Sequence, residues 1–243
     1  IRDRRRVWLR HTPDVVDEKR RKRGDDGSFR AWPLQLIFHN ISWYLAFETS
    51  PIGRNDGLGL IRVLRLDRLV LTKEDGNVRR SSEQEHAHAL ERLERLMDVC
   101  GGVYFGESIE DQLAVMGPLL GRSVKPPYQV LRFSCTPGVF NLIRETPRRL
   151  PLEHIAFSSA IPGDGIKDPG ARCILPPNPA GDSHPYPVEY RLPSWTVERD
   201  WDLRNWLFRW GAGIRIEQPT ELREKQVQEA RAVMELYQPR QGH

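Results

Sequence analysis

The feature of this chain that most constrains its fold is a change in hydrophobic period at about residue 80. Before it, short segments rich in aromatic and branched residues alternate with turn-like stretches, which is typical of β-strands. After it, apolar side chains recur at helical spacing behind a capping-box pattern formed by Ser82 and Glu85. We therefore predict a β unit followed by an amphipathic helix over residues 83–99, ended by Gly101-Gly102.

The β unit is predicted to contain four or five strands within about 70 residues and no helix of any length. Two of its segments flank the turn-like stretch at residues 39–42, so they are predicted to form a hairpin. This density of strands favours a small barrel or a strongly bent sheet. The predicted strands cover residues 5–11, 28–38, 43–49 and 60–72.

A second unit is predicted from residue 128 onward, with the order strand, helix, strand, strand, helix, strand. This is the order of a split βαβ, ferredoxin-like unit, βαββαβ, and the fold class of the whole chain is therefore α+β. We expect three parts: residues 1–80, a connecting helix and linker at 81–127, and residues 128–243. The predicted elements of the second unit cover residues 128–135, 138–146, 152–158, 188–194, 199–210 and 214–217, with a last helix at 220–237.

Positive charge is concentrated at the start of the chain. Residues 1–30 hold 11 Lys or Arg against 6 Asp or Glu, whereas the whole chain has a net charge of only +4. The basic run at residues 19–23 is predicted to be an exposed loop, which either contacts phosphate or is simply solvated.

Several classes of protein are disfavoured. No stretch approaches the roughly 20 apolar residues that cross a bilayer, and no charged-then-apolar leader is present. The three cysteines are far apart, which favours free buried thiols in a reducing cytoplasm. His86 and His88 are two residues apart on a helix, the wrong spacing for one metal. With no catalytic constellation visible, we expect neither an enzyme nor a metal or cofactor.

Two sequence blocks carry a family resemblance. The first is Arg30-Ala31-Trp32-Pro33-Leu34-Gln35-Leu36-Ile37-Phe38, which leads through a turn to Trp43-Tyr44-Leu45. The second is Arg62-Val63-Leu64-Arg65-Leu66-Asp67-Arg68-Leu69. Together they resemble the core of WYL domains, and the C-terminal unit, with its ending from Leu207 to Tyr237, resembles the WCX extension that commonly follows such domains.

The resemblance implies an Sm-like or SH3-like β-barrel with a ferredoxin-like WCX unit behind it. Proteins of this family are bacterial transcriptional regulators, many of them linked to CRISPR or other phage-defence genes. It implies a homodimer, a nucleotide or oligonucleotide ligand bound by the barrel, and DNA bound through an N-terminal winged helix-turn-helix. No such helix-turn-helix is readable here, and since the chain starts with Ile1 we expect it to be a fragment or processed.

The candidate ligand site is built on arginine and aromatic residues. Strand alternation places Arg62 and Arg68 on one face and Arg65 with Asp67 on the other, unless a bulge intervenes. Arginine suits phosphate, and an aromatic ring can stack on a base. Alternation also predicts that Trp43, Leu45 and Phe47 are core, while Tyr44 faces the other way. The candidate ligand contacts are Tyr44, Arg62, Arg65 and Arg68, with His11, Ser28, Arg30 and His39 completing the pocket.

Two alternatives stay open for these residues. Asp67 could pair with an arginine across the sheet and only hold the barrel together, and the hairpin residues could be plain surface. The chain could equally be a non-sensing accessory module of a defence system that binds nucleic acid or a protein partner.

Overall fold

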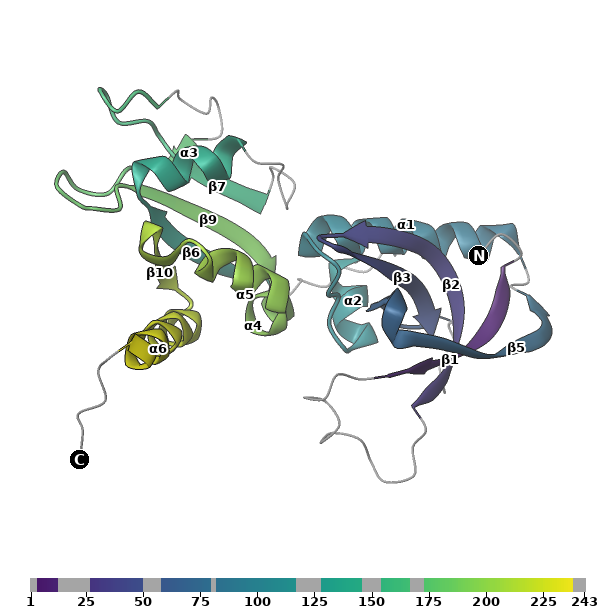
Figure 1. The fold of residues 1–243 in the computed structure, drawn as a ribbon. Helices are drawn as coiled ribbons and strands as arrows, with labels where there is room; N and C mark the ends of the chain where they lie inside the picture. Colours follow the sequence, from purple (N-terminus) through teal and green to yellow (C-terminus); the bar gives the residue numbers. More distant parts are fainter. Residues whose placement is uncertain are drawn as a thin grey trace, which may run out of the picture. The chain divides into compact units, whose positions relative to one another are not determined.

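The computed structural model describes residues 4–12, 27–49, 58–79, 82–116, 128–145, 154–166 and 173–237. The chain divides into two compact units, Ile1–Pro126 and Pro127–His243, each with its own five-stranded sheet (Figure 1). The basic run at residues 19–23 and the linker expected at residues 117–127 lie outside the described residues.

The sheet of the first unit has the strand order β4-β3-β2-β1-β5. The predicted hairpin is confirmed, with Asn40 at a positive φ of 54° in its turn. Among the described residues, β4 and β5 are edges that do not pair with one another, so the expected closed barrel is not confirmed. The strands are β1 (Arg5–His11), β2 (Ser28–His39), β3 (Ser42–Thr49), β4 (Ile61–Arg65) and β5 (Leu69–Arg79).

The prediction of one strand over residues 60–72 was wrong. A single 3-10 turn, η2 (Leu66–Arg68), separates β4 from β5. In this turn the Leu69 amide donates to the Leu66 carbonyl, a local bond of the 3-10 type that a regular strand does not make. The chain therefore changes direction at η2 instead of continuing as a ladder.

The apolar core of the first unit follows strand alternation on β3 only in part. Leu45 and Phe47 are buried together with Leu9 and Ala31, as predicted. Trp43 was expected in the same core, but it is 54% exposed and packs edge-on against Phe38 near the hairpin turn. Alternation is obeyed, yet the sheet does not extend far enough beyond the hairpin end to cover this ring.

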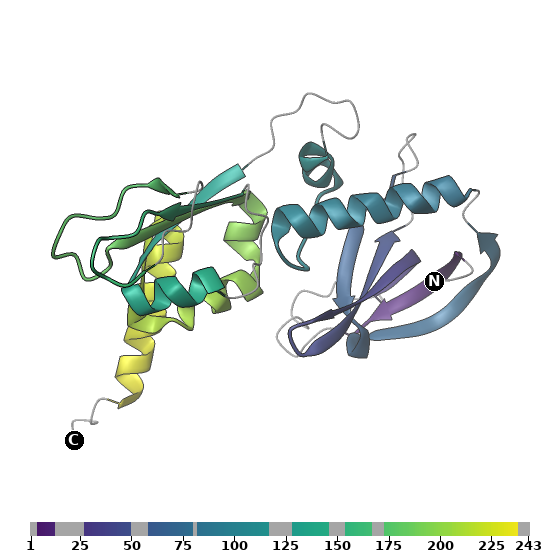
Figure 2. The same ribbon diagram turned by 90° about the horizontal axis from the view of Figure 1, so that it is seen from above.

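Two helices complete the first unit. Helix α1 (Glu83–Cys100) begins at Ser82, whose hydroxyl accepts from the Glu85 amide, and ends at Gly101 with a φ of 63°, so the predicted helix is confirmed. It lies along the sheet and buries an apolar stripe that includes Leu93 and Leu96 (Figure 2). Helix α2 (Ile109–Val115) was not predicted.

The second unit has the strand order β10-β6-β9-β7-β8. Leaving aside β8, the predicted strand–helix–strand–strand–helix–strand sequence is present, and its last strand pairs with its first. Helices α3 and α5 pack on one face of the sheet around Phe140 and Leu207 (Figure 1). The strands are β6 (Tyr128–Cys135), β7 (Ile155–Ser158), β8 (Cys173–Leu175), β9 (Tyr186–Pro193) and β10 (Ile214–Gln218). The helices are α3 (Pro137–Glu145), α4 (Ser194–Arg199), α5 (Trp201–Phe208), η4 (Gly211–Gly213) and α6 (Thr220–Tyr237).

The helix predicted over residues 199–210 corresponds to α5, and the short helix α4 just before it was not predicted. Asp200 ends α4 and caps α5, because its carboxylate accepts from the amides of Asp202 and Leu203. Of the tryptophans on this segment, Trp206 packs against the core and stacks on Tyr190, whereas Trp201 is 62% exposed.

Candidate functional site

Strands β3 and β4 place an aromatic ring and a guanidinium side by side. Tyr44 and Arg65 are directly paired across the two strands, so their side chains leave the same face of the sheet, and both are half-buried. His39, at the end of β2, meets the Tyr44 ring edge-on with 6.0 Å between ring centroids. This face therefore offers a ring for stacking next to a cation.

Asp67 holds the Arg65 guanidinium in place. Arg65 Nε donates to Asp67 Oδ1 at 3.1 Å, and Arg65 Nη2 donates to Oδ2 at 2.7 Å. The hydrogen bond from Arg65, followed by the charges of Arg65 and Arg68, holds the pKa of Asp67 below its usual range. We call Tyr44, His39, Arg65, Asp67 and Arg68 the tyrosine–arginine cluster.

The sequence prediction that Arg62 and Arg68 leave the same face of one strand was wrong, because only Arg62 lies on a strand. Arg62 leaves the opposite face of β4 from Arg65 and pairs across the sheet with Phe47. It is exposed, and no described residue forms an ion pair or hydrogen bond with its side chain. Arg68 lies in η2, where its carbonyl accepts from the Thr12 amide at 2.9 Å and so lies beside the end of β1. The η2 turn interrupts the strand, so side chains before and after it no longer follow one alternating pattern.

The remaining candidates lie elsewhere on the sheet. His11 pairs with Leu69 at the start of β5, close to η2. Arg30 and Ser28 lie at the start of β2, seven or more positions before Ile37, the residue that pairs with Tyr44. The structure thus divides the eight candidate residues among several places, and only Tyr44, His39, Arg65 and Arg68 gather around one.

A buried polar group that the sequence did not reveal holds β3 and β4 against α1. Arg92 Nη1 donates to Glu48 Oε1 at 2.7 Å, and Arg92 Nη2 donates to the Gly59 carbonyl at 2.8 Å. The Gly59 amide in turn donates to the same Glu48 oxygen at 2.9 Å. Both charged side chains are only 6% exposed. A glutamate and an arginine 44 positions apart give no local signal for this contact.

Gln112 of α2 adds a second buried connection to β4. Its side-chain amide accepts from the Ile61 amide at 3.0 Å and donates to the Ile61 carbonyl at 2.7 Å. These bonds extend the backbone hydrogen bonding of the edge strand into α2. They fix β4, and therefore the position of Arg65, relative to the helices.

In the second unit the face of the sheet away from the helices carries charged side chains that pair with each other. Arg132 binds Glu189 and Glu217, at 2.8 Å in each case. The Ser134 hydroxyl donates to Glu217 and accepts from Asn178 Nδ2 at 3.0 Å. We call Arg132, Ser134, Glu189 and Glu217 the β-sheet ion network.

A loop before β9 is tied to the same face. Arg215 forms a bidentate ion pair with Asp182, and this pairing, together with the His184 amide, lowers the pKa of Asp182 to about 2. His184 Nε2 is 2.8 Å from the Ala212 carbonyl. The arginines of this face are therefore engaged by carboxylates.

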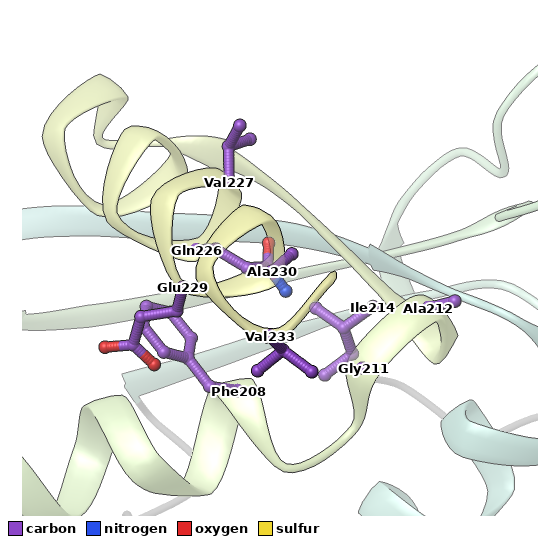
Figure 3. Close-up of a pocket in the computed structure, with 9 residues that line it drawn as sticks. All are labelled: Phe208, Gly211, Ala212, Ile214, Gln226, Val227, Glu229, Ala230 and Val233. Atoms are coloured by element: carbon purple, nitrogen blue, oxygen red, sulfur yellow. The ribbon is translucent and has the colours of Figure 1, made fainter. Parts of the chain in front are cut away.

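A groove of about 530 Å³ lies beneath α6, the last helix. Figure 3 shows Val233 and Ala230 of α6 close to Phe208, at the end of α5, and Ile214, at the start of β10. Leu222 is the only buried residue of this 18-residue helix. Four large apolar side chains near its end are exposed: Val233, Met234, Leu236 and Tyr237.

The described residues contain no group of three or more His, Cys, Asp or Glu that could hold a metal ion. None of the described helices is long and apolar enough to cross a membrane. Cys100 and Cys135 are free and buried, as predicted, and burial raises the pKa of the Cys135 thiol.

Comparison with known proteins identifies the C-terminal segment. Residues 194–234, from α4 into α6, match the family model of the WCX domain. No curated protein matches the chain. The WCX extension expected from the sequence is therefore supported at these residues.

Two solved structures are similar to most of the chain at low sequence identity. One is the proteasome accessory factor B/C (PafBC) of Arthrobacter aurescens, 14% identical with a TM-score of 0.29, matching 98% of this chain and 26% of that one. The other is a CRISPR Cas-related protein, 14% identical with a TM-score of 0.44, matching 98% of this chain and 49% of that one. The chain thus spans about a quarter of the first structure and about half of the second. TM-scores this low do not establish a common fold.

Proposed function

We propose that the chain is the ligand-sensing and oligomerising part of a bacterial transcriptional regulator, and not an enzyme. The first unit binds a nucleotide or oligonucleotide, and the unit that contains the WCX match supports a cytoplasmic homodimer. DNA is bound by a winged helix-turn-helix outside residues 1–243, and CRISPR or other phage-defence genes are the expected targets. The observation that carries the proposal is the direct pairing of Tyr44 with Arg65 on one face of the sheet.

The tyrosine–arginine cluster has the chemistry that a nucleotide requires. A base can stack on the Tyr44 ring, and a phosphate can accept paired N–H bonds from Arg65. Asp67 now accepts those bonds, but the Arg65–Asp67 pair is 36% and 61% exposed and an exposed ion pair contributes only about 0–1 kcal/mol. A phosphate can therefore displace Asp67 at little cost, and the freed turn η2 links ligand binding to the junction of β4 and β5.

Helix α6 supports the homodimer. An isolated helix of this length is marginal in water, so its stability depends on packing. Its single buried residue, Leu222, lies in the first turn, while its apolar end and the groove beneath it are exposed. Its four glutamates and three basic residues nearly balance, so two copies of the helix do not repel each other strongly.

The ligand site is tested with two arginines of one strand. Nucleoside phosphates and cyclic dinucleotides are titrated calorimetrically into the wild type, Arg65→Ala and Arg62→Ala. Loss of a charge-assisted pair at the cluster should weaken binding at least about tenfold in Arg65→Ala, while Arg62→Ala, on the opposite face, stays within about twofold. If Arg62→Ala binds more weakly than Arg65→Ala, the ligand site lies on the other face of the sheet. Equal binding by both variants overturns the proposed site.

The dimer is tested by mass measurement in solution. Val233→Glu should convert a dimer to a monomer, whereas Glu229→Gln in the same groove should not. A wild-type monomer contradicts this part of the proposal. If the protein is a dimer but the ligand does not change DNA binding by the complete regulator, the accessory-module alternative is favoured.

A further inference from the structure

The outer face of β1, β2 and β5 carries a run of basic and aromatic side chains apart from the tyrosine–arginine cluster. Adjacent strands place these residues in register, so that cations alternate with tryptophans in both directions. We call this set the Arg–Trp ladder. Its members are Arg6, Trp8 and Arg10 on β1, Arg30 and Trp32 on β2, and Lys73 on β5.

Trp8 is the centre of the ladder. It pairs directly with Arg30 on one side and with Lys73 on the other. The Arg30 guanidinium lies over the Trp8 ring at 4.6 Å from its centroid, a distance at which the cation and the ring attract each other. One position along, the Arg6 guanidinium lies 5.4 Å from the centroid of the Trp32 ring.

The ladder faces outward. The residues between its members on β1 and β2, including Leu9 and Ala31, point the other way and form the buried core. Arg10, Arg30 and Lys73 are exposed, and Trp8 is half-buried. Successive members of the ladder therefore lie about 7 Å apart along a strand and about 5 Å apart across strands, and the cations on either side of Trp8 are separated by about twice those distances.

We propose that the Arg–Trp ladder binds single-stranded nucleic acid. Bases of a single strand can continue the stack that Arg30 makes on Trp8, because aromatic rings and guanidinium planes both accept a base face. Arg10 and Lys73, at either side, neutralise neighbouring phosphates. A duplex would reach only the cations, since its bases are already stacked.

This surface goes beyond the proposed function, because it uses neither Tyr44 nor Arg65. Arg30 belonged to the pocket expected from the sequence, but the structure places it with Trp8 instead. Failure at one surface therefore leaves the other untouched, and the two can be tested separately in one protein.

The test is fluorescence anisotropy of labelled dT12 at several salt concentrations, on the full chain. Trp8→Leu removes the ring and keeps an apolar side chain, and should weaken binding about fivefold or more without changing the salt dependence. Arg10→Gln or Lys73→Gln should lower the slope of log K against log salt by about 0.7 each. Arg30→Lys removes the planar guanidinium, so it should lower the affinity for dT12. Because the charge is kept, the salt slope should not change.

Controls separate the ladder from general basicity. Arg191→Gln removes an exposed strand arginine from the second unit and should change neither affinity nor slope. The wild type should bind an abasic 12-mer more weakly than dT12. The Trp8→Leu variant should bind the two strands equally. Equal binding of dT12 and the abasic strand, or loss of dT12 binding in Arg65→Ala but in no ladder variant, overturns the proposal. Thermal unfolding of each variant excludes loss of fold as the cause.

Discussion

Arg30 in the first unit and Arg132 in the second occupy comparable places, each on the face of a five-stranded sheet that points away from the apolar core. Arg132 is held by two carboxylates, Glu189 and Glu217. Arg30 instead lies over the ring of Trp8. Stacking engages the plane of a guanidinium and not its N–H donors, which are the groups that recognise phosphate. A half-buried arginine can thus serve structure in one unit and an exposed one ligand binding in the other.

The largest effect is expected at a third arginine, which is fully buried. Replacing Arg92 by Met leaves the Glu48 carboxylate buried without this cation, which typically costs about 3–5 kcal/mol. Urea unfolding should show this loss in the first unit. Arg95→Met, a half-buried position one turn further along α1, is the matched control and should cost less than about 1 kcal/mol. If both variants lose the same free energy of unfolding, the Arg92–Glu48 pair has no special contribution to stability.

The comparison itself is tested by Arg132→Gln and Arg30→Gln. Arg132→Gln removes the paired cation from Glu189 and leaves Glu217 with only the longer 3.7 Å contact to Arg215, and it should lower the free energy of unfolding by about 2 kcal/mol. Arg30→Gln removes the exposed stack on Trp8, about 0.5–1 kcal/mol, and should weaken dT12 binding. If Arg30→Gln destabilises the protein as much as Arg132→Gln does, the distinction between structural and binding arginines fails.

The smallest effect concerns pH in the second unit. Pairing with Arg215 lowers the pKa of Asp182 from its ordinary 3.8 to about 2 in the folded chain. A lowered folded pKa stabilises the fold above pH 3.8, and this contribution is lost as pH falls from about 4 to about 2. Carboxyl NMR titration should show the low pKa in the wild type and a return toward 3.8 in Arg215→Gln. An unchanged Asp182 pKa in this variant would show that the His184 amide, and not Arg215, is responsible.

The sequence predicted most elements of the fold because their signals are local. The hairpin around Asn40, the Ser82 cap and the Gly101 end of α1 each depend on residues within a few positions of one another. The succession of strands and helices in the second unit follows from hydrophobic period alone. Helix α2 was missed because its seven residues span only two turns, too few for a period to show.

The candidate site was less predictable, because its residues interact across strands. Alternation along residues 62–68 assumed a continuous strand, and the η2 turn broke it. As a result Tyr44 lies beside Arg65 and not beside Arg62. The partner of Arg30 comes from β1 and that of Arg92, on α1, comes from β3, at sequence distances that no motif records.

The sequence by itself therefore determined most of the segments that form strands and helices, because backbone period and hydrophobicity act over a few residues. Only the tertiary structure decided what each arginine touches. A long charged side chain takes the partner that strand pairing brings within reach, and in this chain those partners are an aspartate two residues away, a buried glutamate on another strand, two carboxylates, or a tryptophan ring.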